Sequence, residues 1–114
     1  MSELLHKTLV NSNELETLLE QRAKGEVDFV LVDVREQIEY DIGHIKGVDI
    51  LKPTSTFKIW KQDFINQYMD KTIIFTCRTG ARSGSVQNTF QQNGMRHIIN
   101  HFGGIISYTG EIEK

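Results

Sequence analysis

Residues 72–83 of the chain are Thr-Ile-Ile-Phe-Thr-Cys-Arg-Thr-Gly-Ala-Arg-Ser, an apolar run that passes into a charged, glycine-containing turn. The first five residues are continuously apolar or β-branched, which is typical of a parallel strand covered on both faces. Beyond the turn, Val86 and Phe90 lie on one helical face and predict a helix from about residue 83 to residue 92. A buried strand that leads through a short loop into a helix indicates an α/β fold.

The rest of the chain repeats this alternation of strand and helix. A second, nearly continuous apolar run, residues 28–34, predicts another buried strand. Shorter strands are expected at 7–10, 48–51 and 97–100, and helices between 11 and 25, at 35–42, 56–68 and 105–108. Residues 44–46, between two glycines, are expected to form a tight loop. The pattern predicts one α/β domain over residues 1–114, with a mostly parallel central sheet and helices on both faces.

Composition narrows the class of function. The chain has 13 Lys and Arg residues against 15 Asp and Glu residues, which gives a net charge of -2. A protein that binds nucleic acid usually carries a strongly basic face, which this charge does not indicate. The single cysteine cannot form an internal disulfide or a cysteine-rich zinc site. No apolar run approaches the ~18 residues that a membrane span needs, and the first residues do not resemble a signal peptide. We therefore expect a cytoplasmic protein without nucleic-acid or membrane partners.

The single cysteine, Cys77, lies where the predicted strand ends, and open parallel sheets bind ligands at the carboxyl ends of their strands. The start of a helix offers unpaired N–H groups, Gly80 lets the loop curl around an anion, and Arg78 and Arg82 add positive charge. These features favour the thiolate. A thiol with an ordinary pKa of ~8.5 is only about 3% ionised at pH 7, so a nucleophilic cysteine needs such help. The alternative is a small buried cysteine without a chemical role.

Three stretches carry a family resemblance. Residues 32–48 contain Val-Asp-Val-Arg-Glu, Glu-Tyr and Gly-His-Ile-Lys-Gly-Val, and resemble the rhodanese pattern D-V-R-E-x-x-E-Y-x-x-G-H-I-x-G-A. Residues 77–83 resemble that family's active-site loop, C-R-x-G-x-R-S, and Gly103-Gly104 resembles its late glycine pair. The resemblance extends from about residue 5 to residue 109. Two positions depart from the family pattern: Val48 stands where alanine is common, and Tyr108 where tryptophan often occurs.

The resemblance implies a rhodanese-like fold and the activity of a thiosulfate sulfurtransferase. In that family the cysteine takes the outer sulfur of a donor such as thiosulfate, forms a persulfide, and passes the sulfur to cyanide, a thiol or a protein acceptor. By this resemblance Cys77 is the catalytic sulfur carrier. The small anionic donor is then bound by the loop residues Arg78, Thr79, Gly80, Ala81 and Arg82. The reaction uses neither a metal nor an organic cofactor.

Two other functions remain as alternatives. Cysteine-dependent phosphatases and arsenate reductases, some of the same fold, place an arginine after Cys-x5, whereas Arg82 follows Cys77 as Cys-x4-Arg. The shorter loop suits a single sulfur atom better than a tetrahedral phosphate. A rhodanese module that only binds partners is the second alternative, although such modules typically lack the cysteine.

Charged residues near the predicted site need partners of their own. Asp33 ends a buried strand, and an uncompensated carboxylate there would raise the pKa of the thiol, so we expect an arginine or hydrogen bonds to neutralise it. Asp33 and Arg35 are interpreted as a structural ion pair. Arg82 opens a helix, where its charge meets the positive end of the dipole. An acidic neighbour such as Asp33 or Glu39, or the sulfur of Cys77, can offset this cost, and we expect the sulfur to be the main partner. His97 and His101 are not expected to form a zinc site.

Overall fold

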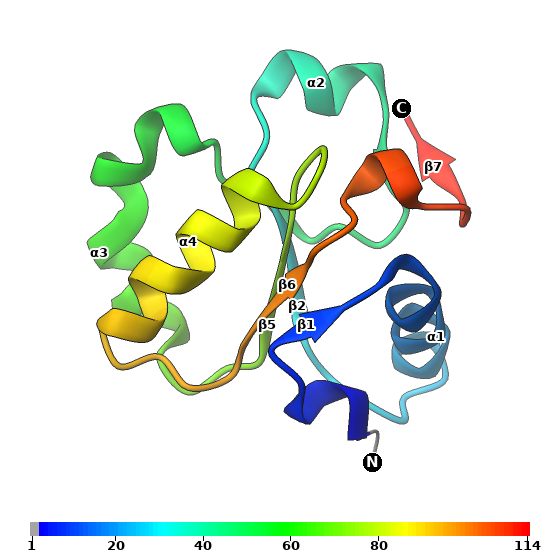
Figure 1. Cartoon of the computed structure of the whole chain (residues 1–114), viewed down its shortest axis with the longest axis horizontal. Helices are drawn as coiled ribbons and strands as arrows, with labels where there is room; N and C mark the ends of the chain where they lie inside the picture. The colour runs from blue at the N-terminus through cyan, green and yellow to red at the C-terminus, as the bar shows by residue number, and fades with distance from the viewer. Residues whose placement is uncertain (1–2) are drawn as a thin grey trace.

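The computed structural model describes residues 3–114 and has a parallel sheet at its centre (Figure 1). Five strands lie in the order β1–β6–β5–β2–β4, and every neighbouring pair is parallel. The strands are β1 (Leu9–Val10), β2 (Val30–Asp33), β4 (Ile50–Leu51), β5 (Ile73–Thr76) and β6 (Ile98–His101). The prediction of a mostly parallel central sheet is confirmed.

Helices cover both faces of this sheet, as the sequence predicts (Figure 1). The α-helices are α1 (Ser12–Ala23), α2 (Gln37–Ile42), α3 (Phe57–Tyr68) and α4 (Ala81–Gln92), and the short 3-10 helices are η1 (Glu3–His6), η2 (Thr54–Thr56) and η3 (Ile105–Ser107). Side chains of a strand alternate between the two faces of a sheet. On β5, Ile73 and Phe75 therefore pack on the α3 and α4 side, whereas Ile74 packs on the α1 side.

Helix α1 begins at a capping box formed by Asn11 and Glu14. The Asn11 side chain accepts a hydrogen bond from the Glu14 N–H at 2.8 Å, and the Glu14 carboxylate accepts one from the Asn11 N–H at 2.9 Å. Both groups would otherwise lack an intrahelical partner. Leu15 and Leu18 on the inner side of this helix are fully buried.

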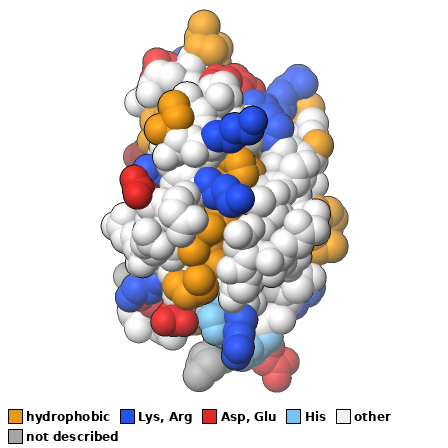
Figure 2. Space-filling model, turned by 90° about the vertical axis from the view of Figure 1, so that its left-hand side faces the viewer, with side chains coloured by type: hydrophobic (Ala, Val, Ile, Leu, Met, Phe, Trp, Pro, Cys, Tyr) orange, Lys and Arg blue, Asp and Glu red, His pale blue; other side chains and the backbone are white. Residues whose placement is uncertain are grey.

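Helices α3 and α4 form one outer layer, shown in space-filling form in Figure 2. Apolar side chains run along this face, and basic side chains are scattered over it with acidic ones between them. Phe57, which is half-buried, packs edge-on against Trp60 with ring centroids 4.9 Å apart, and against Phe90 at 5.5 Å. Phe57 is thus the outer edge of the aromatic core beneath it.

Most elements begin or end one or two residues from the sequence-based expectation, and one segment differs in type. Residues His44–Ile45 form strand β3, not a loop, because they pair antiparallel with β7 (Ile112–Glu113). Such a pairing joins two short segments far apart in the sequence and leaves no local periodicity. Helix α4 begins at Ala81, two residues before the expected start, and helix α2 begins at Gln37, two residues after it.

No helix among residues 3–114 is long and apolar enough to cross a membrane.

Candidate active site

The loop between β5 and α4 holds Cys77 beneath the surface, at the carboxyl end of the central strand. The Cys77 residue is 1% exposed. Gly80, the cap residue of α4, has a φ of 95°, in the left-handed region that favours glycine. A Cβ added to Gly80 would lie 2.0 Å from the carbonyl oxygen of Phe102, so no other residue fits without moving the backbone. This turn lets the chain curl back over the sulfur.

Three donors converge on the sulfur of Cys77. The Gly80 N–H lies 3.1 Å from Sγ, the Ser83 N–H lies 3.5 Å away, and the Ser83 hydroxyl lies 3.3 Å away. Burial raises the pKa of the Cys77 thiol, but hydrogen bonds from Ser83, Gly80 and Thr79 outweigh it, so the pKa lies below its ordinary value. The groups that chiefly lower this pKa are the loop donors, and the charge of Arg82, on which the sequence argument relied, has a smaller effect.

Ser83 and Asn100 extend this arrangement into the protein, and the sequence-based list of site residues contains neither. The Ser83 hydroxyl lies 2.6 Å from Oδ1 of Asn100, and Nδ2 of Asn100 donates to the Gly80 carbonyl at 3.2 Å. Ser83 is fully buried, and Asn100 is 4% exposed. Ser83 stands in the loop motif and could have been found there. Asn100 lies on β6, where the sequence offers no signal of its contact.

The arginines of the loop have different surroundings. Arg82 makes two hydrogen bonds to the carboxylate of Glu39, at 2.7 and 2.8 Å. The pKa of Glu39 falls to about 2, chiefly because of these bonds. The pKa of Arg82 is raised first by the bonds to Glu39 and to a smaller extent by the charge of Cys77. Glu39, and not the sulfur, is therefore the main partner of Arg82, which corrects the expectation above.

Arg78 is the cation of the loop that faces solvent. It is exposed, and within residues 3–114 its guanidinium has no hydrogen bond or ion pair. Its carbonyl, in contrast, accepts a hydrogen bond from the Ile106 N–H at 3.1 Å. The backbone of Arg78 is thus fixed while its charge remains available to an anion.

Asp33 and Arg35 form the buried ion pair that the sequence predicts. Nη2 of Arg35 lies 2.8 Å from Oδ2 of Asp33, and Nε donates to both carboxylate oxygens. Asp33 is 1% exposed and Arg35 is 5% exposed. A buried carboxylate with these partners stays neutralised as a pair. Arg35 also donates to the Gly43 carbonyl at 2.7 Å, and so fixes the end of α2 beside the site.

A second glycine lets the segment after β6 lie against the cysteine loop. Gly104 has a φ of 68°, and a Cβ there would lie 2.2 Å from the Arg78 carbonyl oxygen. The Ile105 N–H donates to the Cys77 carbonyl at 2.9 Å. A shallow pocket of about 260 Å³ opens here, lined by Arg35, Glu39, Ile42, Arg78, Ile105 and Ile106.

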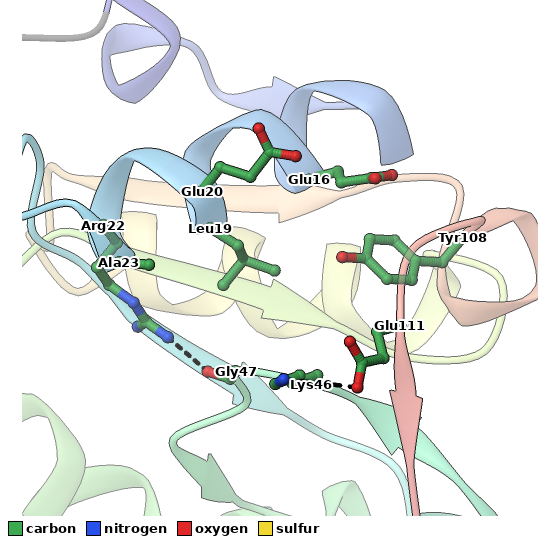
Figure 3. A pocket seen from close by; sticks show the side chains of 9 residues that line it. All are labelled: Glu16, Leu19, Glu20, Arg22, Ala23, Lys46, Gly47, Tyr108 and Glu111. Carbon is green, nitrogen blue, oxygen red and sulfur yellow. Dashed lines mark hydrogen bonds and ion pairs between the residues drawn. The ribbon is translucent and has the colours of Figure 1, made fainter.

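A larger pocket, of about 440 Å³, lies elsewhere, beside α1 and the residues around β3 (Figure 3). Some polar groups that line it bond to one another: Lys46 pairs with Glu111 at 3.5 Å, and Arg22 donates to the Gly47 carbonyl at 2.6 Å. None of its lining residues belongs to the loop of residues 77–83.

The two histidines considered for a metal do not come together. His101 is fully buried, with its ring nitrogens 2.8 Å from the hydroxyls of Ser12 and Thr76, whereas His97 is exposed. Burial lowers the pKa of His101 to about 4. Over the described part of the chain, residues 3–114, no group of three or more His, Cys, Asp or Glu side chains is arranged to hold a metal ion.

Comparisons with known proteins show the family and the fold of the chain. A protein named tRNA uridine(34) hydroxylase from Wigglesworthia glossinidia brevipalpis is 37% identical over 91 residues, which are 76% of this chain and 28% of that protein. The chain therefore spans less than a third of the length of this relative. A rhodanese-related protein from Thermoplasma volcanium superimposes with a TM-score of 0.75 at 23% identity, covering 94% of this chain and 98% of the other.

The human single-domain sulfurtransferase has the same fold, with a TM-score of 0.68 at 23% identity over 86% of this chain and 91% of the other. The family model described as the rhodanese-like domain matches residues 14–111, from the first turn of α1 to the residue before β7. This match includes the ion pair of β2, the cysteine loop and the late glycine pair. The chain belongs to the rhodanese-like domain family.

Proposed function

We propose that this protein is a sulfurtransferase that carries a sulfane sulfur as a persulfide on Cys77. The observation that carries the proposal is the convergence of the Gly80 N–H, the Ser83 N–H and the Ser83 hydroxyl on one buried sulfur. Donors fixed around a thiol lower its pKa and supply the thiolate, which is the nucleophilic form. A buried cysteine without a chemical role would not need three donors.

The reaction has two steps that balance in atoms and electrons. The thiolate of Cys77 attacks the outer sulfur of a thiosulfate-type donor, the new S–S bond forms, and sulfite leaves with the electron pair of the broken bond. A thiophilic acceptor, such as cyanide, a thiol or a protein thiolate, then attacks the outer sulfur of the persulfide. The electron pair of that S–S bond returns to Sγ, so the thiolate is regenerated.

The loop residues divide the work of binding. The backbone N–H groups of Thr79, Gly80 and Ser83 face the sulfur and suit the negative charge of a persulfide. The free charge of Arg78 attracts an anionic donor to the pocket above the loop. Arg82 contributes through the position of α4, because its guanidinium is held by Glu39.

A second candidate is a role in tRNA modification, which the 37% identity to a protein named tRNA uridine(34) hydroxylase favours. That relative is more than three times as long as the matched segment, so its named activity is not assigned to these residues. Phosphate ester hydrolysis is less favoured, since the arginine that would clasp a phosphate is paired with Glu39. Negligible turnover of an aryl phosphate ester is expected.

Intact-protein mass spectrometry without reductant tests the proposal directly. After exposure to thiosulfate, the protein is expected to gain the mass of one sulfur atom, and cyanide is expected to remove that mass and release thiocyanate. The control is Cys77→Ser, which fits the same space but cannot carry a persulfide and is expected to gain nothing. Sulfur transfer by a folded Cys77→Ser protein, or no mass gain from any sulfane sulfur donor in the wild type, would overturn the proposal.

A further inference from the structure

A chain of three buried groups lies behind the cysteine, running from the Gly80 carbonyl through Asn100 to Ser83. Nδ2 of Asn100 lies 3.2 Å from the Gly80 oxygen, and Oδ1 lies 2.6 Å from the Ser83 hydroxyl. The same hydroxyl lies 3.3 Å from Sγ of Cys77. Ser83 is fully buried and Asn100 is 4% exposed, so water does not compete for these bonds.

The chemistry of these groups fixes the direction of each hydrogen bond. A carbonyl oxygen only accepts, so the NH2 group of Asn100 must face Gly80, and its Oδ1 must face Ser83. Oδ1 also only accepts, and therefore the Ser83 hydroxyl is the donor of the 2.6 Å bond. A hydroxyl has one hydrogen. Ser83 thus has two acceptors, Oδ1 and Sγ, and can satisfy only one of them fully at a time.

We propose that Asn100 is a positioning residue for Cys77, because its Oδ1 holds the Ser83 hydroxyl while Sγ is neutral and yields it to Sγ when the sulfur is charged. Sγ is charged as a thiolate and neutral as a thiol. As the inner sulfur of a persulfide it is also neutral, because the charge then lies on the outer sulfur. The persulfide part of this inference rests on the proposed sulfurtransferase function, and the thiol part does not.

The competition between acceptors determines the acidity of the thiol. When the hydroxyl turns to the thiolate, Oδ1 of Asn100 is left buried without that donor, which is unfavourable. Asn100 therefore raises the pKa of Cys77 above the value that the Ser83 hydroxyl and the loop amides would give in its absence. The Gly80 carbonyl does not depend on Asn100, since the Gly84 N–H also donates to it, at 3.0 Å. Removal of Asn100 leaves that carbonyl satisfied.

The other charged or titratable groups around Cys77 stay the same in every comparison below. They come from β2, α2, the loop, α4 and β6, and they are Asp33, Arg35, Glu36, Glu39, Arg78, Arg82 and His101. Because none of them is altered, a change in the thiol pKa that depends on Ser83 reports the hydroxyl alone.

The test is the pH dependence of the alkylation rate of Cys77 with iodoacetamide, which reports the thiolate and needs no sulfur donor. Ser83→Ala removes a donor and is expected to raise the thiol pKa by about half to one pH unit. Asn100→Leu removes the competing acceptor and is expected to lower the pKa, increasing the ionisation constant about three- to tenfold. In the double variant, Asn100→Leu is expected to leave the Ser83→Ala value unchanged.

Gln87→Leu is the matched control. Gln87 lies one turn beyond Ser83 on α4 and donates to the Ile98 carbonyl of β6 at 3.1 Å, so its loss breaks a buried bond between the same two elements. It is expected to lower the melting temperature without moving the alkylation profile. Asn100→Val, which suits a strand, is the second variant if the leucine protein does not fold.

Two results would overturn the inference. One is a raised thiol pKa in the Asn100 variants, and the other is an equal shift in the presence and absence of the Ser83 hydroxyl. Either would show that Asn100 acts by shaping the loop. A protein that takes no sulfur from any donor would instead overturn the proposed function, and the alkylation comparison would still be readable.

Discussion

The guanidinium of Arg82 forms a two-point ion pair with the carboxylate of Glu39, in which each Nη donates to one carboxylate oxygen, at 2.7 and 2.8 Å. The pair joins the first turn of α4 to α2, and Glu39 is a stronger partner of Arg82 than the sulfur is. Arg82 therefore connects α4 to α2, although its position two residues after Gly80 in the loop indicates anion binding. This relationship leads to the first prediction.

Arg82→Met is expected to destabilise the protein by about 1 kcal/mol, because it removes a two-point ion pair that is partly exposed. The alkylation profile of Cys77 is expected to move upward by less than about half a pH unit, since the sulfur is a lesser partner of this arginine. A melting curve measured beside the alkylation profile checks both. An unchanged melting temperature with a large shift in the profile would show that Arg82 acts on the sulfur itself.

Arg78→Gln is expected to raise KM for thiosulfate about tenfold with little change in kcat, because the exposed charge attracts the donor without touching the scissile bond. Stability is expected to stay the same, since the guanidinium has no bond within residues 3–114. Arg96→Gln is the control, as it removes an exposed positive charge that precedes β6, at the other end of the sheet. Steady-state kinetics with thiosulfate and cyanide measure the difference, and equal effects of the two variants would contradict it.

Gly80→Ala and Gly94→Ala compare two glycines with nearly the same backbone angle. Their φ values are 95° and 90°, so both substitutions carry the cost of a left-handed residue, about 1–2 kcal/mol. An added Cβ at Gly94 meets nothing within 4 Å, whereas at Gly80 it lies 2.0 Å from the Phe102 oxygen. We expect Gly80→Ala to cost clearly more stability in a denaturation curve and to lose sulfur transfer. Similar losses for both variants would count against the close packing of the loop.

The buried His101 predicts a loss of stability in mild acid. Its pKa is lowered from 6.5 to about 4 by burial, so the folded protein favours the neutral ring. The stabilisation is complete above pH 6.5 and is lost as the pH falls through 6.5 toward 4, by about 3 kcal/mol in total. His101→Gln keeps a polar side chain between Ser12 and Thr76 but cannot titrate, and is expected to flatten this part of the curve.

His97→Gln serves as the control for this prediction, because His97 is exposed and lies just before the same strand. Urea denaturation at several pH values between 4 and 7 measures the free energy of unfolding of each protein. If His101→Gln retains the full pH dependence of the wild type, other groups cause the loss.

Local signals in the sequence were sufficient for the frame of the site. The runs before Val34 and Cys77 are apolar on both faces, and neighbouring parallel strands bring their carboxyl ends together. The Asp33–Arg35 pair involves residues only two apart, which restricts where the guanidinium can lie. The capping box of α1 likewise lies within four residues.

Local sequence patterns do not determine which residues from distant segments come into contact. Glu39 precedes Arg82 by 43 residues, and Asn100 follows Ser83 by 17, so their pairing depends on how the sheet places α2 and β6 around the loop. The pairing of His44–Ile45 with Ile112–Glu113 is of the same kind. In each case the residue types allow several partners, and only the packed fold selects one.

The backbone bonds between the cysteine loop and the segment after β6 have a consequence for how the site moves. Cys77 and Arg78 each accept an amide from that segment, and Gly104 lies against the Arg78 carbonyl. Opening of either segment breaks the hydrogen bonds between them. Hydrogen exchange at the amides of Gly80, Ile105 and Ile106 is therefore expected to occur in one cooperative event. On the proposed function, the donors around the sulfur are thus expected to be preorganised before a sulfur compound arrives.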